Sequence, residues 1–97
     1  MYVETRRQSI SMISHHVDSI LHIARHHVES GEVEEAIFEG DSILLKSRQK
    51  RYVVLSQRGS GRYLMIVVAF KMKGRVRVIT AREMNQKERT YYKRVAK

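Results

Sequence analysis

Residues 75–94 read RVRVITAREMNQKERTYYKR and decide the kind of fold that this chain adopts. The first eight residues are basic and β-branched, which is typical of a strand. Asn85 follows with Glu88 three positions later, and this spacing is a helix start signal. A strand that leads directly into a helix predicts an α+β domain. The stretch also gathers seven Lys and Arg residues beside Tyr91 and Tyr92, which suits a polyphosphate partner better than a small neutral substrate.

Two helices are predicted before the sheet, from hydrophobic residues at helical spacing. The first covers residues 15–26, with Ser14 as its cap. Four apolar residues share one side of this helix: Val17, Ile20, Leu21 and Ala24. The second covers residues 32–38, with Ser30 as its cap and Gly40 just past its end.

From Asp41 onward the hydrophobic pattern alternates, which predicts strands over residues 42–47, 52–57 and 62–72. Gly59 and Gly61 indicate a hairpin loop rather than a phosphate cradle. With residues 75–82, the short links predict a four-stranded antiparallel sheet. The fold class is therefore α+β, with two N-terminal helices, this sheet and a C-terminal helix. Residues 1–13 form an extension or short strand, and residues 14–97 form a single domain.

The net charge of +9 over 97 residues is unevenly distributed. Residues 1–50 hold six Lys and Arg against eight Asp and Glu, whereas residues 51–97 hold thirteen against two. This segregation indicates a functional face and a counter-face, since solubility alone does not require one sign in one half. No stretch is long and apolar enough for a membrane span or a signal sequence, so we expect a cytoplasmic protein. The chain has no cysteine, so disulfide and thiolate chemistry is excluded.

Five histidines crowd into residues 15–27. His22 and His26 are four apart, so a helix would place both imidazoles on one face, with His15 on the same side. Three such imidazoles could hold a metal ion. The face carries no carboxylate at a suitable step, so we expect a solvated face and no metal or other cofactor. The alternative is metal-dependent hydrolysis through these histidines, which a chelator would abolish.

The chemistry open to a basic surface with aromatic residues is RNA cleavage. That reaction needs a base for the 2′-hydroxyl, cations for the scissile phosphate and an acid for the leaving oxygen. Aromatic rings can stack a splayed base. The candidate RNA-binding residues are Lys71, Lys73, Arg75, Arg77, Lys87 and Arg89. The tyrosines of the last helix could equally pack against the sheet, and Glu88 could simply cap the helix at Asn85.

Several segments together resemble the BrnT-type toxins, the ribonuclease halves of bacterial toxin–antitoxin pairs. The segments are HIARHHV at residues 22–28, EVEEA at 32–36, RYL at 62–64 and VITAREM at 78–84, with KER at 87–89 and Tyr92. The resemblance covers residues 14–94. It implies a RelE-like ribonuclease fold and metal-independent cleavage of RNA, free or on the ribosome, that halts translation. It also implies a hetero-oligomer with a cognate antitoxin, a small protein with a ribbon-helix-helix or similar repressor part.

The resemblance also implies four catalytic residues. His26, Arg62, Arg82 and Tyr92 match residues of the family's motifs, and Arg62 and Arg82 would contact the phosphate. This chain departs from the family pattern at His27, where many members have glycine and a positive φ is expected after the helix. It also lacks the tryptophan of an N-terminal strand. A non-catalytic basic module that binds RNA or protein is the alternative function. It would be favoured if His26 and Arg82 lay on opposite sides of the sheet.

Overall fold

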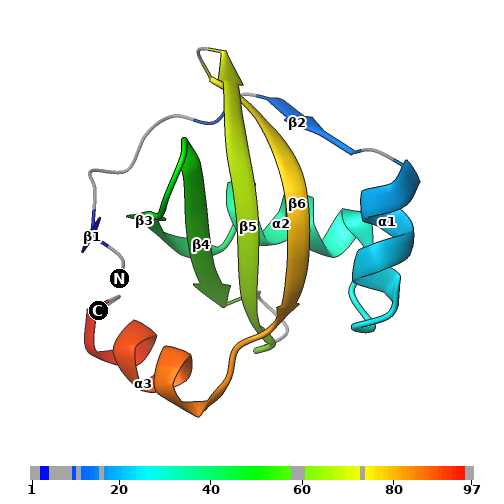
Figure 1. Cartoon of the computed structure of the whole chain (residues 1–97). Helices are drawn as coiled ribbons and strands as arrows, with labels where there is room; N and C mark the ends of the chain where they lie inside the picture. Colours follow the sequence, from blue (N-terminus) through cyan, green and yellow to red (C-terminus); the bar gives the residue numbers. More distant parts are fainter. Residues whose placement is uncertain are drawn as a thin grey trace.

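Within the part of the chain that the structure describes, three helices and six strands form a single sheet-based domain (Figure 1). The structure is a computed structural model that describes residues 3–4, 10, 12–15, 17–57, 61–72 and 74–95. The elements are β1 (Val3–Glu4), β2 (Met12–Ser14), α1 (Val17–Ala24), α2 (Ser30–Phe38), β3 (Asp41–Lys46), β4 (Arg51–Gln57), β5 (Tyr63–Met72), β6 (Arg75–Glu83) and α3 (Gln86–Val95). None of these described helices is long and apolar enough to span a membrane.

The sheet has the strand order β1-β3-β4-β5-β6-β2. Its centre is the predicted antiparallel meander, and the four strand predictions are correct to within one residue. The prediction of a purely antiparallel four-stranded sheet is wrong, because β1 pairs antiparallel with β3 and β2 pairs parallel with β6. These edge strands have two and three residues. Such short segments carry no alternating pattern, and their partners are distant in the sequence.

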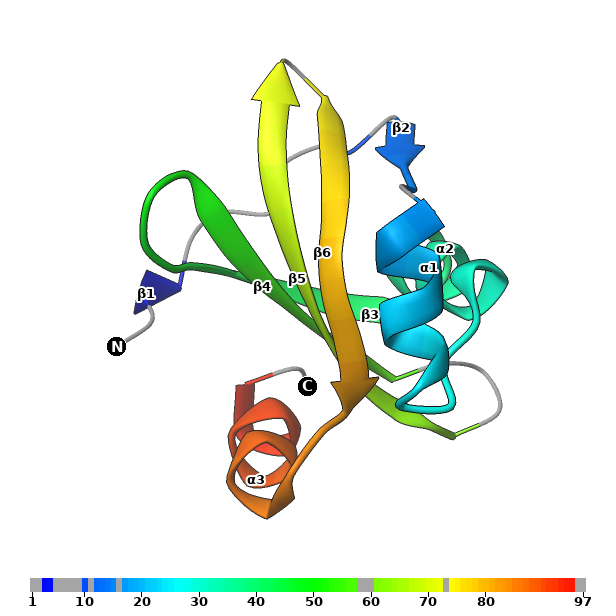
Figure 2. The same ribbon diagram turned by 45° about the vertical axis from the view of Figure 1, so that its right-hand side comes forward.

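The two faces of the sheet bury separate apolar clusters. On one face, which we call the helix side, α1 and α2 pack over residues such as Val54, Ile66 and Val78. On the other face, α3 packs over Leu55 and Met65. Because neighbouring strand residues point to opposite faces, the long apolar run of β5 supplies both clusters. Figures 1 and 2 show α1 and α2 on one side of β6, with α3 beneath the opposite face.

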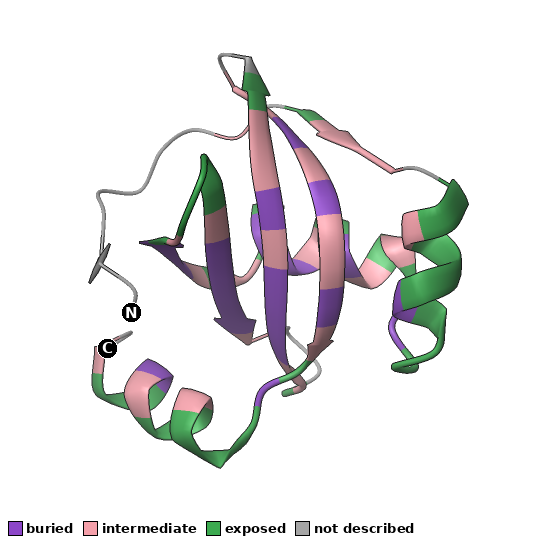
Figure 3. Cartoon of the chain, in the orientation of Figure 1, coloured by how far each residue is buried: buried purple, intermediate pink, exposed green. Residues whose placement is uncertain are grey.

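Helix α1 differs from its prediction in length and in orientation. It covers Val17–Ala24, and Ser14 belongs to β2 instead of capping the helix. The apolar stripe predicted on one side lies mostly in solvent, with Val17 70% and Leu21 60% exposed. The buried residue of α1 is Ile23, which is 0% exposed. Figure 3 shows this as a helix that is green over most of its length.

The helix ends are fixed by local hydrogen bonds. His27, in the turn after α1, has φ 60°, which confirms the positive φ expected there. Helix α2 begins at Ser30 with Glu29 as its cap, so Ser30 is not the cap. The Glu32 carboxylate accepts the backbone N–H of Glu29 at 3.0 Å. The hairpin loop predicted around Gly59 lies mainly outside the described residues, although Gly61 has φ 92°.

Candidate functional site

The face of the sheet opposite α1 and α2 is basic above α3, and we call this surface the open face. Strand pairing aligns Arg51, Ala69 and Arg77 in one row, and Leu55, Met65 and Arg82 in another. Val53, Val67 and Thr80 form the row between them. Between the cations of these rows, Val67 and Thr80 are partly exposed, whereas Val53, Leu55 and Met65 are buried. In Figure 2 this surface is the side of β4 and β5 away from α1 and α2, above α3.

A β-bulge brings Arg77 and Arg82 to the same face. They are five positions apart, so strict alternation would point them to opposite faces. The register shifts between Val67 and Val68, which pair with Thr80 and Val78. Ile79 is the additional residue in β6, and it restores Arg82 to the open face. This is why two cations at an odd spacing can contact one ligand.

Arg82 forms a two-pronged ion pair on the open face. Its Nη1 and Nη2 atoms donate to Oε1 and Oε2 of Glu88, each at 2.9 Å. Nη1 also donates to the carbonyl oxygen of Glu83 at 3.0 Å. The Arg82 side chain is 36% exposed, so solvent or a ligand can reach it. A guanidinium held in this fork geometry matches a phosphate as well as a carboxylate.

Glu88 connects Arg82 to the start of α3. Its Oε1 atom accepts the backbone N–H of Asn85 at 2.9 Å, and the Asn85 side chain accepts the N–H of Glu88 at 2.8 Å. The predicted capping box is therefore confirmed. The same carboxylate orients Arg82, so capping and positioning are performed by one side chain.

Arg62 lies on the other side of the sheet, where it joins three elements. Its Nη1 donates to both carboxylate oxygens of Glu32, at 2.9 and 2.7 Å, and its Nε donates to Glu83 at 2.9 Å. Nη2 donates to the carbonyl of His27 at 2.7 Å. The hydrogen bond to Glu32, more than the other contacts, raises the pKa of Arg62 above its ordinary value. These contacts brace α1, α2 and the end of β6.

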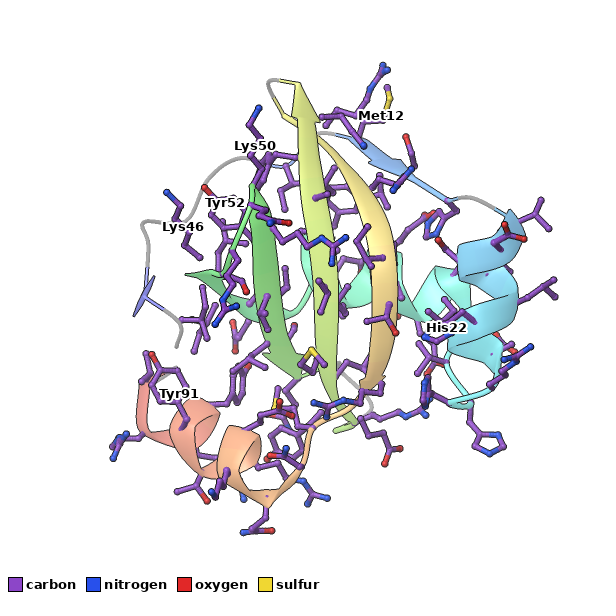
Figure 4. The ribbon with its side chains drawn as sticks, viewed as in Figure 1. Met12, His22, Lys46, Lys50, Tyr52 and Tyr91 are labelled. Carbon is purple, nitrogen blue, oxygen red and sulfur yellow. The ribbon has the colours of Figure 1, made fainter. Side chains whose placement is uncertain are left out.

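His26 is exposed in the turn after α1, and its ring lies edge-on to His22 with centroids 5.3 Å apart. This turn is on the helix side, so the structure does not bring His26 and Arg82 together. In Figure 4 the neighbouring His22 lies on α1 at the right, far from Tyr91 on α3. His15 contacts Glu34 at 3.1 Å instead of joining the other two histidines. No group of three or more metal ligands occurs among the described residues.

Tyr92 is buried beneath α3, with 4% of its surface exposed. Its hydroxyl oxygen accepts the N–H of Gln57 at 3.2 Å, and the hydroxyl donates to the carbonyl of Asp41. Its ring packs edge-to-face on Tyr63. Burial raises the pKa of Tyr92 above its ordinary value. This geometry favours the packing interpretation that the sequence left open.

The six candidate RNA-binding residues do not lie together. Arg75 and Arg77 flank the helix-side residue Val76 and so point to the open face, and Lys87 on α3 borders that face. Lys71 is exposed near the end of β5. Arg89 lies over the Tyr63 ring at 5.5 Å. Lys73 is outside the described residues. Arg51 was missed because the predicted strand began at residue 52, but β4 begins at Arg51, and its register opposite Ala69 puts it on the open face.

The comparisons with known proteins give one family. Residues 15–88 match the family model described as "Ribonuclease toxin, BrnT, of type II toxin-antitoxin system". No curated protein and no solved structure matches the chain. The matched range runs from the histidine-rich segment through the capping box of α3, and it confirms the resemblance seen in the motifs. The chain therefore belongs to the BrnT family of ribonuclease toxins of type II toxin–antitoxin systems.

Proposed function

We propose that this toxin is a metal-independent endoribonuclease that cleaves RNA on the open face and thereby halts translation. The observation that carries the proposal is Arg82, a forked and partly exposed guanidinium on the same face as Arg77 and Lys87. Single-stranded RNA binds to such a surface because a row of cations can follow its backbone.

The groups around Arg82 supply the needs of a phosphodiester cleavage. Arg82 and Lys87 stabilise the charge that develops on the phosphate when the 2′-oxygen attacks the phosphorus. The bond from phosphorus to the 5′-oxygen then breaks. Glu88 is the nearest carboxylate to accept the proton of the 2′-hydroxyl, and the Lys87 ammonium donates a proton to the leaving oxygen. His26 and Arg62 take no part in this arrangement, because the sheet separates them from Arg82.

A cognate antitoxin is expected to neutralise the toxin by covering the open face. The cations that bind RNA there would attract an acidic segment of the antitoxin. The remainder of the antitoxin is expected to be a small repressor-like domain, such as a ribbon-helix-helix protein. The two proteins would then form a hetero-oligomer in the cytoplasm.

The test is induced expression in bacteria of the wild type, Arg82→Ala and Arg25→Ala. Arg25 is an exposed cation of the helix side and serves as the matched control. We expect growth arrest with loss of RNA for the wild type and for Arg25→Ala, and normal growth for Arg82→Ala. Purified wild type should cleave RNA equally well with and without EDTA. Cleavage that EDTA abolishes, or an active Arg82→Ala, contradicts the proposal.

One observation favours a second function, a non-catalytic module that binds RNA. None of the four histidines that the structure describes lies on the open face, and Glu88 neutralises Arg82. Such a module would bind RNA through the same cations without cutting it. Harmless expression of a wild type that retains RNA affinity in vitro would select this function.

A further inference from the structure

A hollow of about 210 Å³ opens on the open face between α3 and the strands β3 and β4. Its lining residues are Leu45, Val53, Leu55, Lys87, Glu88 and Tyr91. Leu45, Val53 and Leu55 belong to the apolar cluster under α3. Lys87 and Glu88 belong to the proposed cleavage site, so the hollow adjoins that site. In Figure 4 Tyr91 lies on the side of α3 that faces these strands.

The lining has an apolar part and a charged part. Leu45, Val53 and Leu55 are at most 3% exposed, and the half-buried Tyr91 adds an aromatic surface. Lys87 and Glu88 supply the charged groups. An apolar cavity that ends in charged groups suits a ligand with a flat apolar body joined to a polar, negatively charged part. A nucleotide of RNA has this construction.

The size of the hollow limits what can enter it. Sites for drug-sized ligands occupy roughly 300–1,000 Å³, so a hollow of about 210 Å³ suits one ring system rather than a complete nucleotide. A bound base would leave its ribose and phosphate outside. The hollow adjoins Arg82, because Glu88 lines the hollow and also accepts a hydrogen bond from Arg82 at 2.9 Å.

We propose that this hollow is a base pocket, which holds the nucleobase next to the scissile phosphate against Tyr91 and the three aliphatic residues. The ribose and phosphate of that nucleotide pass Lys87 and Glu88 and reach Arg82. This inference rests on the proposed ribonuclease function and adds the part of the substrate that the site recognises. It also explains why a flat aromatic side chain borders the catalytic groups.

The test measures the affinity of short single-stranded RNA oligonucleotides, each with one base removed at a different position. For the wild type, the absence of one particular base should weaken binding about 5- to 100-fold, the range of base–aromatic stacking. Tyr91→Leu should weaken binding of intact RNA by a similar factor and should no longer respond to that missing base. Tyr91→Phe keeps the ring and removes only the hydroxyl. It therefore shows whether the ring alone accounts for the effect on RNA binding. Thr90→Ala, on the exposed side of α3, is the helix control.

The possible results separate this inference from the ribonuclease proposal. Cleavage that Tyr91→Leu leaves unchanged, with no position sensitive to base removal, overturns the base pocket but not the ribonuclease. RNA that binds through one base without being cut overturns the ribonuclease but supports the pocket. If Tyr91→Leu impairs only antitoxin binding, the pocket holds a protein side chain and the inference fails. If Tyr91→Leu does not fold, the affinities of the wild type for the RNA oligonucleotides that lack one base decide whether the hollow binds a base.

Discussion

At the scale of single residues, Arg62 and Arg82 have the same side chain but opposite surroundings. Arg62 makes four hydrogen bonds on the helix side, to two carboxylates and one backbone carbonyl. Arg82 contacts one carboxylate and one carbonyl on the open face. A phosphate could reach Arg82 by displacing Glu88, whereas Arg62 has little capacity left for a ligand. We therefore infer that Arg62 supports the fold.

Arg62→Leu should lower the free energy of unfolding by about 1–3 kcal/mol, because the Glu32 and Glu83 carboxylates each lose their ion pair with Arg62. The loss stays below that of a fully buried pair, since the Arg62 side chain is 23% exposed and solvent screens the charges. Urea denaturation followed by circular dichroism measures it. Arg25→Leu, the exposed control, should remain within about 0.5 kcal/mol of the wild type. Equal effects of the two substitutions would contradict the structural role of Arg62.

Tyr92→Phe should lower the free energy of unfolding by about 1–2 kcal/mol at neutral pH, because two hydrogen bonds of the hydroxyl are lost. The difference should shrink at high pH. Burial raises the pKa of Tyr92 in the folded state, whereas the unfolded tyrosine ionises near its ordinary pKa of about 10. The wild type therefore loses this stabilisation as the pH rises above about 10. Urea titrations of the wild type and Tyr92→Phe at several pH values measure the difference in unfolding free energy. A difference that stays the same above about pH 10 would contradict the prediction.

At the scale of elements, α1 shows the limit of reading a helix from its sequence. Helical spacing identifies Val17, Ile20, Leu21 and Ala24 as one stripe but does not reveal what the stripe faces. In the fold, Ile23 alone enters the core from α1, on a different side of the helix. Helical periodicity therefore predicted the element and misjudged its orientation.

The orientation of α1 is testable by alanine substitution. Ile23→Ala should lower the free energy of unfolding by about 2–5 kcal/mol, since Ile23 is 0% exposed. Leu21→Ala should change it by less than about 0.5 kcal/mol, since Leu21 is 60% exposed. Both variants lie in the same helix and remove similar side chains, so each controls for the other in thermal or urea denaturation. A larger loss of unfolding free energy for Leu21→Ala than for Ile23→Ala would show that the stripe predicted from the sequence is buried.

Local signals predicted most of the fold and part of the site. The central strands and the Asn85–Glu88 capping box depend on residues that are close in the sequence, and both are confirmed. The edge strands depend on distant pairing and were missed. Placing Arg82 with Arg77 and Lys87 required the bulge at Ile79, which alternation alone does not reveal. His26 and Arg62 were grouped with Arg82 by their match to family motifs, which does not show which side of the sheet a residue occupies.

At the scale of the whole molecule, the uneven charge of the chain becomes a difference between the two faces of the sheet. The helix side carries the acidic residues of α1 and α2, and the open face carries the cations of β4 and β6. A polyanion would therefore approach the open face and be repelled from the other. This explains why the acidic first half and the basic second half occur in one small domain.

The salt dependence of RNA binding reports how many cations touch phosphates. For single strands, the logarithm of the affinity falls with the logarithm of the salt concentration by about 0.7 per contact. Arg51→Ala and Arg77→Ala should each reduce this slope by about 0.7, because both residues occupy one row of the open face. Arg25→Ala on the helix side should leave it unchanged. Fluorescence anisotropy of a labelled RNA at several salt concentrations measures the slopes. If Arg25→Ala and Arg51→Ala change the slope equally, RNA binds through diffuse charge and not through the open face.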